Sequence, residues 1–494
     1  MHQQSETNSA PDFELLDFGA LAAERELTLL PQVFLKTSKF DDLNSPNSKK
    51  VALLGNRGVG KSAVLAMLGK IAERDKAVVL RLSPEDYAYE YLTESLAKET
   101  AGAWAKQGAY TAAWKHLLYV SAMKAAIESQ PGLKTGHSKR IYNFIRDNYS
   151  NASTNPIGTL VSYMKRLESI KIGKLEAGAK AKELQNLYSL EELNSLLDDL
   201  EVFCSKKPIL ILVDELDKGW DASEDAIAFV AGLFQAGAAI SIRTPSVRVI
   251  MTLRRELFES IPSLNDDSQK LRDAVEMLDW NAKELLAMIA KRIKHSLQLN
   301  KDLPDTDAWH VVMPPLLWGY SSFDAILDFT LWRPRELIHI CSQILDIARH
   351  SNRSLPFSFQ DIEEAVNVYA KERCSDLVAE FRFQYPGLLS IIETFRNGPV
   401  SFEREDLELH CLRLSTGDLH VSEMAEWCTE KEPAELIEIF WKIGFLRANL
   451  NPTSTKTLFS SAFQVRFANI NNSQNFKIHE AFSRYLDCHE QKNS

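Results

Sequence analysis

The chain has 494 residues, of which 45% are hydrophobic and 25% are charged, a composition typical of soluble proteins with several globular domains. Its formal net charge of −10 excludes a protein that coats nucleic acid over its whole surface, although a local basic patch is compatible with it. No apolar run approaches the ~20 residues of a membrane helix, and the N-terminal MHQQSETNSAPD lacks the features of a secretion signal, so we expect a cytoplasmic protein. Six isolated cysteines without a C-x-x-C pair indicate neither a zinc site nor a disulfide framework.

The first folded elements follow a polar tail at residues 1–12, which we expect to be flexible. From residue 13 the apolar spacing predicts a helical lead-in. The stretch KKVALLGNRGVGKSAVLAMLGKIAERD then predicts a strand, a glycine-rich loop and a helix. A second short strand, rich in β-branched residues, is predicted for AVVLRLS at 77–83.

The following segment, residues 84–189, has helical periods and two polar breaks. We interpret it as an insertion, because the core pattern resumes only afterwards, at the strand PILILVDE. The chain then alternates between the helix SEDAIAFVAGLFQAG, the strand SVRVIMTLRR, the short strand AVEMLDW and the helix NAKELLAMIAKRIKHSL. Strands that alternate with helices predict a mainly parallel sheet covered on both faces.

These patterns divide the chain into the tail 1–12, an α/β core at 13–280 with the basic helical insertion at about 84–189, a helical lid at 281–373, and a C-terminal domain at 374–494. The lid reads as helices only. The C-terminal domain mixes helices with the β-prone stretch FLRANLNPTSTKTLFSSAFQVRFANI, which predicts a hairpin or wing and hence a winged-helix-like domain.

The glycine-rich loop GNRGVGKS fits the P-loop pattern G-x-x-x-x-G-K-[ST] in the required context, after a strand and before a helix. Its glycines let backbone N–H groups wrap phosphates, and the helix presents its positive N-terminus to them. Lys61 is expected to reach the β and γ phosphates, and the Ser62 hydroxyl to ligate Mg²⁺. The predicted nucleotide-binding residues are Gly55, Asn56, Arg57, Gly58, Val59, Gly60, Lys61, Ser62 and Ala63.

A P-loop needs a second strand that ends in carboxylates, and ILILVDELDKGW supplies one. We predict that Asp214 holds Mg²⁺, directly or through its water, and that Glu215 polarises the attacking water. For Asp217 a helix cap or an ion pair is an equally good interpretation.

Further polar residues are candidates for contacts to the nucleotide. Thr252 ends the strand expected between the two motif strands and is a sensor for the γ-phosphate or the water, unless it makes only a local hydrogen bond. Arg254, Arg255 and Arg272 are candidates for an arginine finger, with surface ion pairs as the alternative. In LWRPRELIHICSQIL, Arg335 is the candidate for a second sensor on the lid, with an ion pair inside the lid as the alternative.

The sequence also favours one nucleotide and resembles one family. The guanine-reading N-K-x-D or T-K-x-D tetrad is absent, so we expect ATP. The stretches AERELTLLPQVFLKTSKF, VDELDKGW, VEMLDWNAKELLAMIAKRI, WRPRELI and IHEAFSRYL, together with the P-loop, resemble bacterial AAA+/STAND-type P-loop ATPases with a D-E-L-D-K-x-W box, which are similar to origin-recognition initiator ATPases.

That resemblance implies an ATPase core, a helical lid and a C-terminal winged helix. It also implies ATP and Mg²⁺ binding, slow hydrolysis, nucleotide-controlled self-association and a setting in antiviral defence. The chain departs from the family pattern in two places. The lid motif is W-R-P-R instead of G-x-R, and no motif fixes the finger arginine.

Charge separates the two regions that could bind nucleic acid. Residues 375–494 hold 12 lysines and arginines against 17 acidic residues, and the expected recognition helix EPAELIEIFWKI is acidic, so we expect it to contact protein. Residues 106–182 hold 13 basic against 4 acidic residues. Their cluster Lys134, Lys139, Arg140 and Arg146, interleaved with aromatic residues, suits backbone contact and base stacking, with docking on an acidic neighbour as the alternative.

Three functions remain open at this point. The first is an ATP-hydrolysing switch whose assembly follows the bound nucleotide. The second is an initiator or loader ATPase stimulated by DNA or RNA through the basic insertion. The third is a scaffold that binds ATP without turnover and recruits an effector protein.

Overall fold

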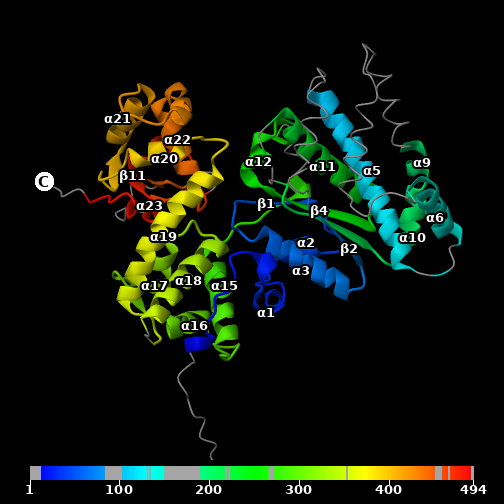
Figure 1. The fold of residues 1–494 in the computed structure, drawn as a ribbon, viewed down its shortest axis with the longest axis horizontal. Coiled ribbons are helices and arrows are strands. Elements are labelled where there is room, and N and C mark those ends of the chain that lie inside the picture. Colours follow the sequence, from blue (N-terminus) through cyan, green and yellow to red (C-terminus); the bar gives the residue numbers. More distant parts are fainter. Residues whose placement is uncertain are drawn as a thin grey trace, which may run out of the picture. The chain divides into compact units, whose positions relative to one another are not determined.

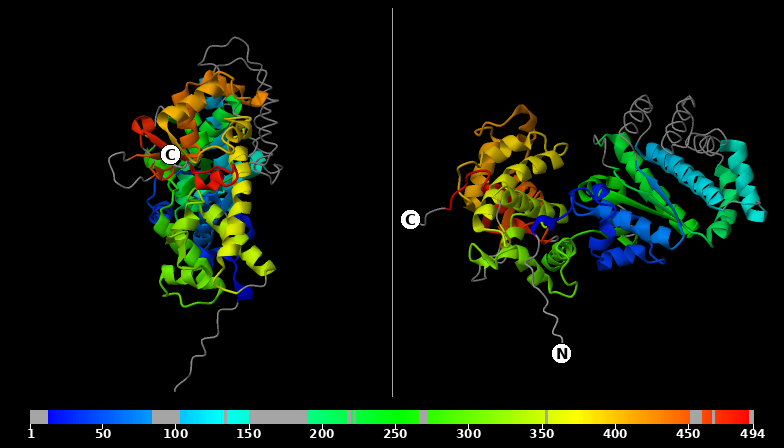
Figure 2. Two further views of the ribbon diagram at one scale, coloured as in Figure 1. Left: turned by 90° about the vertical axis from the view of Figure 1, so that its left-hand side faces the viewer. Right: turned by 60° about the horizontal axis from the view of Figure 1, so that its bottom comes forward.

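The computed structural model describes residues 13–83, 103–130, 132, 135–149, 190–216, 220, 223–265, 272–351, 354–450, 459–465 and 468–490. The chain divides into two compact units, of which one is Lys36–Leu278 and the other joins Met1–Leu35 to Asp279–Ser494. We call the first unit the core and describe each unit by itself (Figures 1 and 2).

The core is built on a five-stranded sheet in the order β2-β3-β4-β1-β5. Every strand pair in it is parallel, which confirms the predicted α/β class. All five residues of β3 are buried, as expected for a strand that is covered on both faces. The strands are β1 (Ala52–Gly55), β2 (Val78–Leu82), β3 (Ile209–Val213), β4 (Val247–Arg254) and β5 (Val275–Met277).

Helices cover both faces of this sheet, with α3 on one face and α5 and α11 on the other (Figure 1 and the right view of Figure 2). The helices of the core are α2 (Ser38–Asn44), α3 (Lys61–Arg74), α5 (Ala103–Ser129), α6 (Gly136–Tyr149), α9 (Leu190–Ser195), α10 (Leu197–Cys204), α11 (Glu224–Arg243), α12 (Arg255–Ser260), α13 (Pro262–Asn265) and the 3₁₀ turn η3 (Arg272–Ala274).

The helix α5 comes from the segment that we interpreted as an insertion, yet it is part of the hydrophobic core. Its Trp114 is buried and donates from Nε1 to the carbonyl oxygen of Phe229 in α11, at 3.2 Å. The two helices approach so closely at Gly232 that a Cβ there would lie 2.7 Å from the Cβ of Tyr110. Part of this segment is therefore a structural helix of the core.

One helix in the described part of the chain, Ala226–Arg243, is long and apolar enough to cross a membrane, by length and composition alone. It lies within α11, and 61% of the stretch is buried inside the fold, as in the core helix of a soluble protein. The apolar character of α11 is explained by its packing against β4 and α5.

The second unit begins with the N-terminal segment, 13–35, which packs on the lid. Leu16 and Phe18 are fully buried in the lid's hydrophobic core, and the guanidinium of Arg292 donates to both carboxylate oxygens of Glu26, at 2.9 and 2.6 Å. We had grouped this segment with the core at 13–280; its apolar side chains and Glu26 instead find their partners after residue 279.

The lid is helical, except for a short hairpin that the sequence did not reveal. Trp318 and Gly319 form its turn with positive φ angles of 48° and 86°. The elements of this region are η1 (Phe13–Leu15), η2 (Ala23–Arg25), α1 (Leu30–Val33), α15 (Ala282–Ser296), α16 (Asp305–Val312), β6 (Leu316–Leu317), β7 (Tyr320–Ser321), α17 (Ser322–Leu327), α18 (Pro334–His350) and α19 (Phe359–Glu380).

The C-terminal region combines helices with an antiparallel sheet in the order β10-β9-β11-β8. The pairing of β9 with β10 confirms the predicted hairpin, whereas β8 and β11 had not been predicted. The elements are α20 (Leu388–Glu393), β8 (Ser401–Glu403), α21 (Arg404–Ser415), η4 (Glu423–Glu430), α22 (Pro433–Lys442), β9 (Leu446–Asn449), β10 (Phe459–Ser460), η5 (Ile470–Asn472), β11 (Asn475–Ile478) and α23 (Glu480–Ser483).

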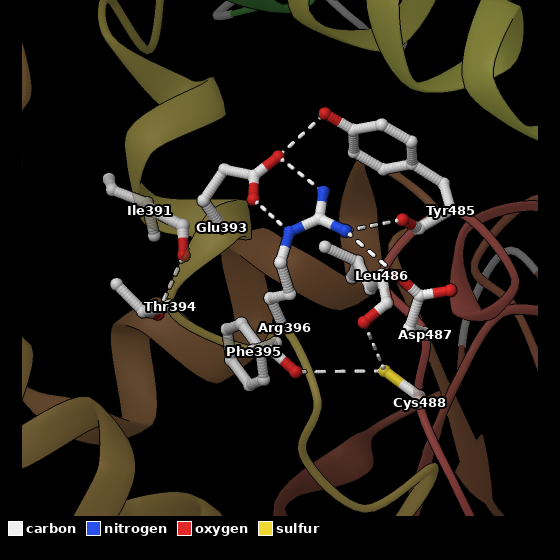
Figure 3. Close-up of polar contacts among 9 residues, drawn as sticks. All are labelled: Ile391, Glu393, Thr394, Phe395, Arg396, Tyr485, Leu486, Asp487 and Cys488. Atoms are coloured by element: carbon white, nitrogen blue, oxygen red, sulfur yellow. Dashed lines mark hydrogen bonds and ion pairs between the residues drawn. The ribbon is translucent and has the colours of Figure 1, made fainter.

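Arg396 fastens the end of the described chain to α20 (Figure 3). Its guanidinium donates to both carboxylate oxygens of Glu393, at 2.6 and 2.9 Å, and to the carbonyl oxygen of Tyr485, at 2.8 Å. The Tyr485 hydroxyl donates to the same carboxylate, at 2.6 Å. These hydrogen bonds, chiefly those from Arg396, hold the pKa of Glu393 below its usual value. The chain segment after α23 is therefore an integral part of this domain.

Candidate nucleotide site

The P-loop connects β1 to α3, as predicted. Gly58 and Gly60 have φ angles of 83° and 95°, a left-handed conformation that favours glycine. At Gly55 a Cβ would lie 2.7 Å from Cγ2 of Val59 and 2.9 Å from the carbonyl oxygen of Leu278, so the loop closes only around glycine. Gly60 is the N-cap of α3 and has no side chain to accept the first-turn N–H groups, which suits a phosphate acceptor.

The ammonium group of Lys61 lies inside this loop. It donates to the carbonyl oxygens of Gly55, at 2.8 Å, and Asn56, at 3.1 Å. The loop therefore combines a fixed cation with the N-terminus of a helix of 14 residues, and this donor set fits the phosphates of a nucleotide.

The acidic strand end lies at the same edge of the sheet. β4 runs between β1 and β3, in a register that pairs Leu53 with Thr252 and Val213 with Met251, which confirms the expected position of this strand. Asp214 directly follows Val213. Because the strands are parallel, the P-loop, Asp214 and Thr252 all lie at the carboxyl edge, where ligands bind in open α/β sheets.

Asp214 is held in place by its neighbours. The hydroxyl of Thr252, a residue only 2% exposed, donates to Oδ1 of Asp214, and the backbone N–H of Glu215 donates to the same oxygen, at 2.9 Å. Asp214 and Ser62, in the first turn of α3, supply a carboxylate and a hydroxyl, which are oxygen ligands of the kind that Mg²⁺ prefers, and these two residues would hold the ion.

Ser83 is a site residue that the sequence did not reveal. Its hydroxyl donates to Oε2 of Glu215, at 2.6 Å. Glu215 itself has a positive φ of 61°, a backbone conformation that is uncommon for residues other than glycine. Ser83 directly follows Leu82, which pairs with Val213 in the neighbouring strand β3. This contact with Glu215 therefore depends on β2 lying next to β3 in the sheet, which the sequence does not show.

The three candidate finger arginines differ in the ion pairs that they form. Arg254 lies 3.9 Å from the carboxylate of Glu256, and Arg255 forms an ion pair with Glu259 at 2.6 Å. Arg272 begins η3, and its side chain lies outside the described residues, as does all of Asp217. Ion pairs within the chain are therefore present for two of the three arginines.

The two arginines of the W-R-P-R motif differ in their environment. Arg333 is buried and forms an ion pair with Glu380 at 2.7 Å, so it is a structural residue of the lid. Arg335 is exposed and donates from Nε to the carbonyl oxygen of Leu21, at 3.0 Å. Both belong to the second unit, and the assignment of Arg335 as a sensor stays a prediction.

The basic cluster is partly used inside the core. Arg140 forms an ion pair with the buried carboxylate of Asp199, at 2.9 Å, and His137 contacts the same carboxylate. Arg146 pairs with Asp147, at 2.8 Å. Lys134 lies outside the described residues, and Lys139 is exposed.

The aromatic residues between these cations are mostly structural. Phe144 is buried, and the hydroxyl of Tyr149 lies 3.0 Å from Nε2 of His116. Tyr142, 38% exposed, is the aromatic residue of this set that faces solvent, and the guanidinium of Arg146 lies over its ring. Docking of α6 on the acidic helix α10 thus accounts for much of this cluster.

Comparisons with known proteins identify relatives over parts of the chain. A family model described as the FunZ-associated C-terminal helical domain matches residues 283–378, from α15 into α19, which is well under half of the chain. The "Putative transposon gamma-delta 80.3 kDa protein" of Escherichia coli K12 is 25% identical over 400 residues, which are 80% of this chain and 55% of that protein. The chain therefore spans about half the length of that relative. "Allergen Alt a 2" of Alternaria alternata is 29% identical over 158 residues, which are 32% of this chain and 80% of that protein.

Two solved structures match most of the chain at low similarity. A Walker-type ATPase of Pyrococcus abyssi has a TM-score of 0.38 at 14% identity, covering 92% of this chain and 95% of that one. The Orc2 protein of Aeropyrum pernix has a TM-score of 0.37 at 12% identity, covering 93% and 92%. These scores are low, so the fold assignment rests on the sheet order and the P-loop geometry.

Proposed function

We propose that this chain is an ATPase that binds ATP with Mg²⁺ and acts as a nucleotide-controlled switch. One observation carries the proposal: the carboxyl edge of the parallel sheet unites a closed P-loop, containing Lys61, with Asp214, Glu215 and Thr252. Adenine is favoured because the sequence lacks the guanine-reading tetrad.

Each residue has a distinct role in this proposal. The P-loop amides and Lys61 bind the phosphates, and Ser62 and Asp214 hold Mg²⁺, which when bound neutralises charge on the transferred phosphoryl group. Glu215 orients and polarises the attacking water. Ser83 fixes the orientation of Glu215, and Thr252 fixes that of Asp214. Gly58 and Gly60 supply the backbone curvature that aims the amides at the phosphates.

Two substitutions test this proposal against a scaffold that binds ATP without turnover. Lys61→Ala should abolish ATP binding, measured by calorimetry, because the loop loses its only lysine. Glu215→Gln should keep ATP binding and lower kcat by about 10²-fold or more, since the isosteric amide cannot polarise water. Parent-like hydrolysis by both variants would exclude the site, and ATP binding without turnover in the parent protein, with any activator, would favour the scaffold.

The proposal extends to assembly and setting. We place the protein in the cytoplasm and expect ATP to favour a homo-oligomer in which Arg254, Arg255 or Arg272 reaches the nucleotide of a neighbouring subunit, while Arg335 serves as the lid sensor. The resemblance to D-E-L-D-K-x-W ATPases supports a role in antiviral defence with a separate effector protein. The element order from α20 through β11, with β9 and β10 as a hairpin, supports the winged-helix interpretation of the C-terminal domain.

A second candidate function is stimulation of the ATPase by DNA or RNA. Exposed Lys139 and Tyr142 on α6 favour it, within a segment that has 13 basic against 4 acidic residues. Lys139→Glu should then remove the stimulation and weaken its salt dependence. Lys76→Glu, on the exposed turn after α3, is the matched control. Equal stimulation of both variants would eliminate this candidate.

A further inference from the structure

The joint between the lid and the C-terminal domain is a continuous helix. α19 contributes Ile362, Val366 and Tyr369 to the hydrophobic core of the lid, and Cys374 and Leu377 to the core of the C-terminal domain. The expected domain boundary between residues 373 and 374 therefore falls inside this helix. A hinge at this position would have to break α19, because the chain has no linker there.

Arg447 ties the two regions together a second time. It lies on β9, its side chain is only 6% exposed, and its guanidinium donates to Asp328 of the lid, at 2.8 Å, and to Glu480 of α23, at 2.6 Å. Burial acts to raise the pKa of the Glu480 carboxyl, but the nearby positive charges, of which Arg447 is the strongest, outweigh it and lower the pKa to about 2. A buried arginine that binds two carboxylates holds them at a fixed separation. Moving either carboxylate away would leave a buried charge without a partner, which costs free energy.

Arg484 makes a third connection. Its guanidinium lies over the rings of Trp318 and Phe329, at 5.3 and 5.1 Å from their centroids, and donates to Glu363 and Asn367 of α19. Trp318 is the turn residue of the lid hairpin, and its Nε1 donates to Glu363 as well, at 3.2 Å. The hairpin, which was not predicted, thus supplies a ring on which the guanidinium of Arg484 packs.

The fourth connection is a buried ionic cluster between the start of α18 and the end of α19. Arg333 pairs with Glu380 at 2.7 Å, and Arg373 pairs with Glu336 at 3.2 Å. Close packing accompanies it: Gly444, with a φ of 85°, leaves room for Leu331, whose methyl groups lie 3.2 and 3.3 Å from where a Cβ would be. Leu331 is part of the C-terminal core.

We infer that the described residues between 279 and 490, with the N-terminal segment 13–35 fastened to the lid through Arg292, form one rigid lever. The functional use of this lever, in a motion driven by ATP, rests on the proposed function. In this lever, any motion of the lid carries the C-terminal domain with it, without a hinge at residue 373. The chain passes between the two units at Leu35–Lys36 and Leu278–Asp279.

Spin-label distances test this lever in the full-length chain, with Cys488→Ser to remove the partly exposed thiol. Labels are placed on exposed positions: Asp346→Cys in the lid, Leu412→Cys in the C-terminal domain and Ile242→Cys in the core. In Glu215→Gln protein, the 346–412 distance distribution should be narrow and identical with and without ATP and Mg²⁺. A shift, or a second population, in that pair on adding ATP would overturn the inference.

Variants of the joint separate this inference from the proposed function. Arg447→Met, or the less buried Arg484→Met, should broaden the 346–412 distribution even without nucleotide, whereas Arg413→Met, at an exposed position of the same domain, should not. A narrow distribution in both joint variants would contradict the lever. If ATP fails to bind but the joint variants broaden the distribution, the proposed function fails and the lever stands.

Discussion

At the scale of single residues, the candidate site depends on hydrogen bonds that fix two carboxylates. Thr252 and the Glu215 N–H hold Asp214, and Ser83 holds Glu215. Asp214 and Glu215 follow a buried apolar strand, so their backbone positions are set by the sheet. Their side-chain directions depend on these neighbours, because both residues are only half-buried and a carboxylate that is not packed has several rotamers of similar energy.

Ser83→Ala should lower kcat about tenfold and leave the dissociation constant for ATP unchanged. A hydrogen bond to a charged group contributes about 1.5 kcal/mol, which corresponds to this factor when it is lost only in the reacting geometry. Steady-state kinetics and calorimetry measure the two quantities. Ser83→Thr, which keeps the hydroxyl, should recover most of the rate; a parent-like kcat in Ser83→Ala would show that this contact does not position Glu215.

At the scale of elements, the packing of α5 on α11 decides whether the core closes. Gly232 permits the close crossing, since a Cβ there would lie 2.7 Å from the Cβ of Tyr110 and 2.9 Å from the backbone nitrogen of Thr111. Backbone atoms cannot move aside to make room for the added Cβ as easily as the end of a flexible side chain can. The helix that looked like part of an insertion thus depends on Gly232, which lies 122 residues after its contact Tyr110.

Gly232→Ala should destabilise the core by about 1–3 kcal/mol through overpacking, in spite of the better helix propensity of alanine. Gly108→Ala on α5 is the matched control, because a Cβ there meets nothing within 4 Å. We expect this control to gain about 0.5–1 kcal/mol. Urea unfolding, followed by tryptophan fluorescence, gives both values; equal effects of the two changes would refute the close crossing.

At the scale of the whole molecule, a fall in pH should lower the free energy of unfolding of the C-terminal region. The loss should begin at a pH above that at which carboxylates take up protons. Burial, together with the positive charge of nearby Arg413, lowers the pKa of His410 to about 4. Nε2 of His410 lies 2.9 Å from the Thr394 hydroxyl, and its ring packs against the ring of Phe395. Burial lowers the pKa of His479 too. Because the unfolded chain takes up these protons first, the stabilisation is complete above pH ~6.5 and is lost as the pH falls towards ~4.

His410→Gln should flatten this dependence while keeping a partner for Thr394. The parent protein should lose up to ~3 kcal/mol from this histidine between pH 6.5 and 4. The thermal midpoint, measured across this range at constant ionic strength, reports the loss, and the exposed His420→Gln is the control. A parent and His410→Gln protein with parallel pH profiles would disprove the assignment.

The amino-acid sequence by itself determined the five strands of the core sheet, the P-loop and the acidic strand end, whereas the expected position of β4 between the two motif strands came from the likeness to this class of ATPase. These features depend on local patterns: an apolar strand, glycines at fixed spacing, and carboxylates at a strand end. Only the tertiary structure decided that Ser83 meets Glu215, that α5 belongs to the core, that Arg140 is paired with Asp199, and that α19 joins two domains. Each of these depends on partners distant in the sequence, whose choice is made by packing and strand order, and no local pattern encodes it.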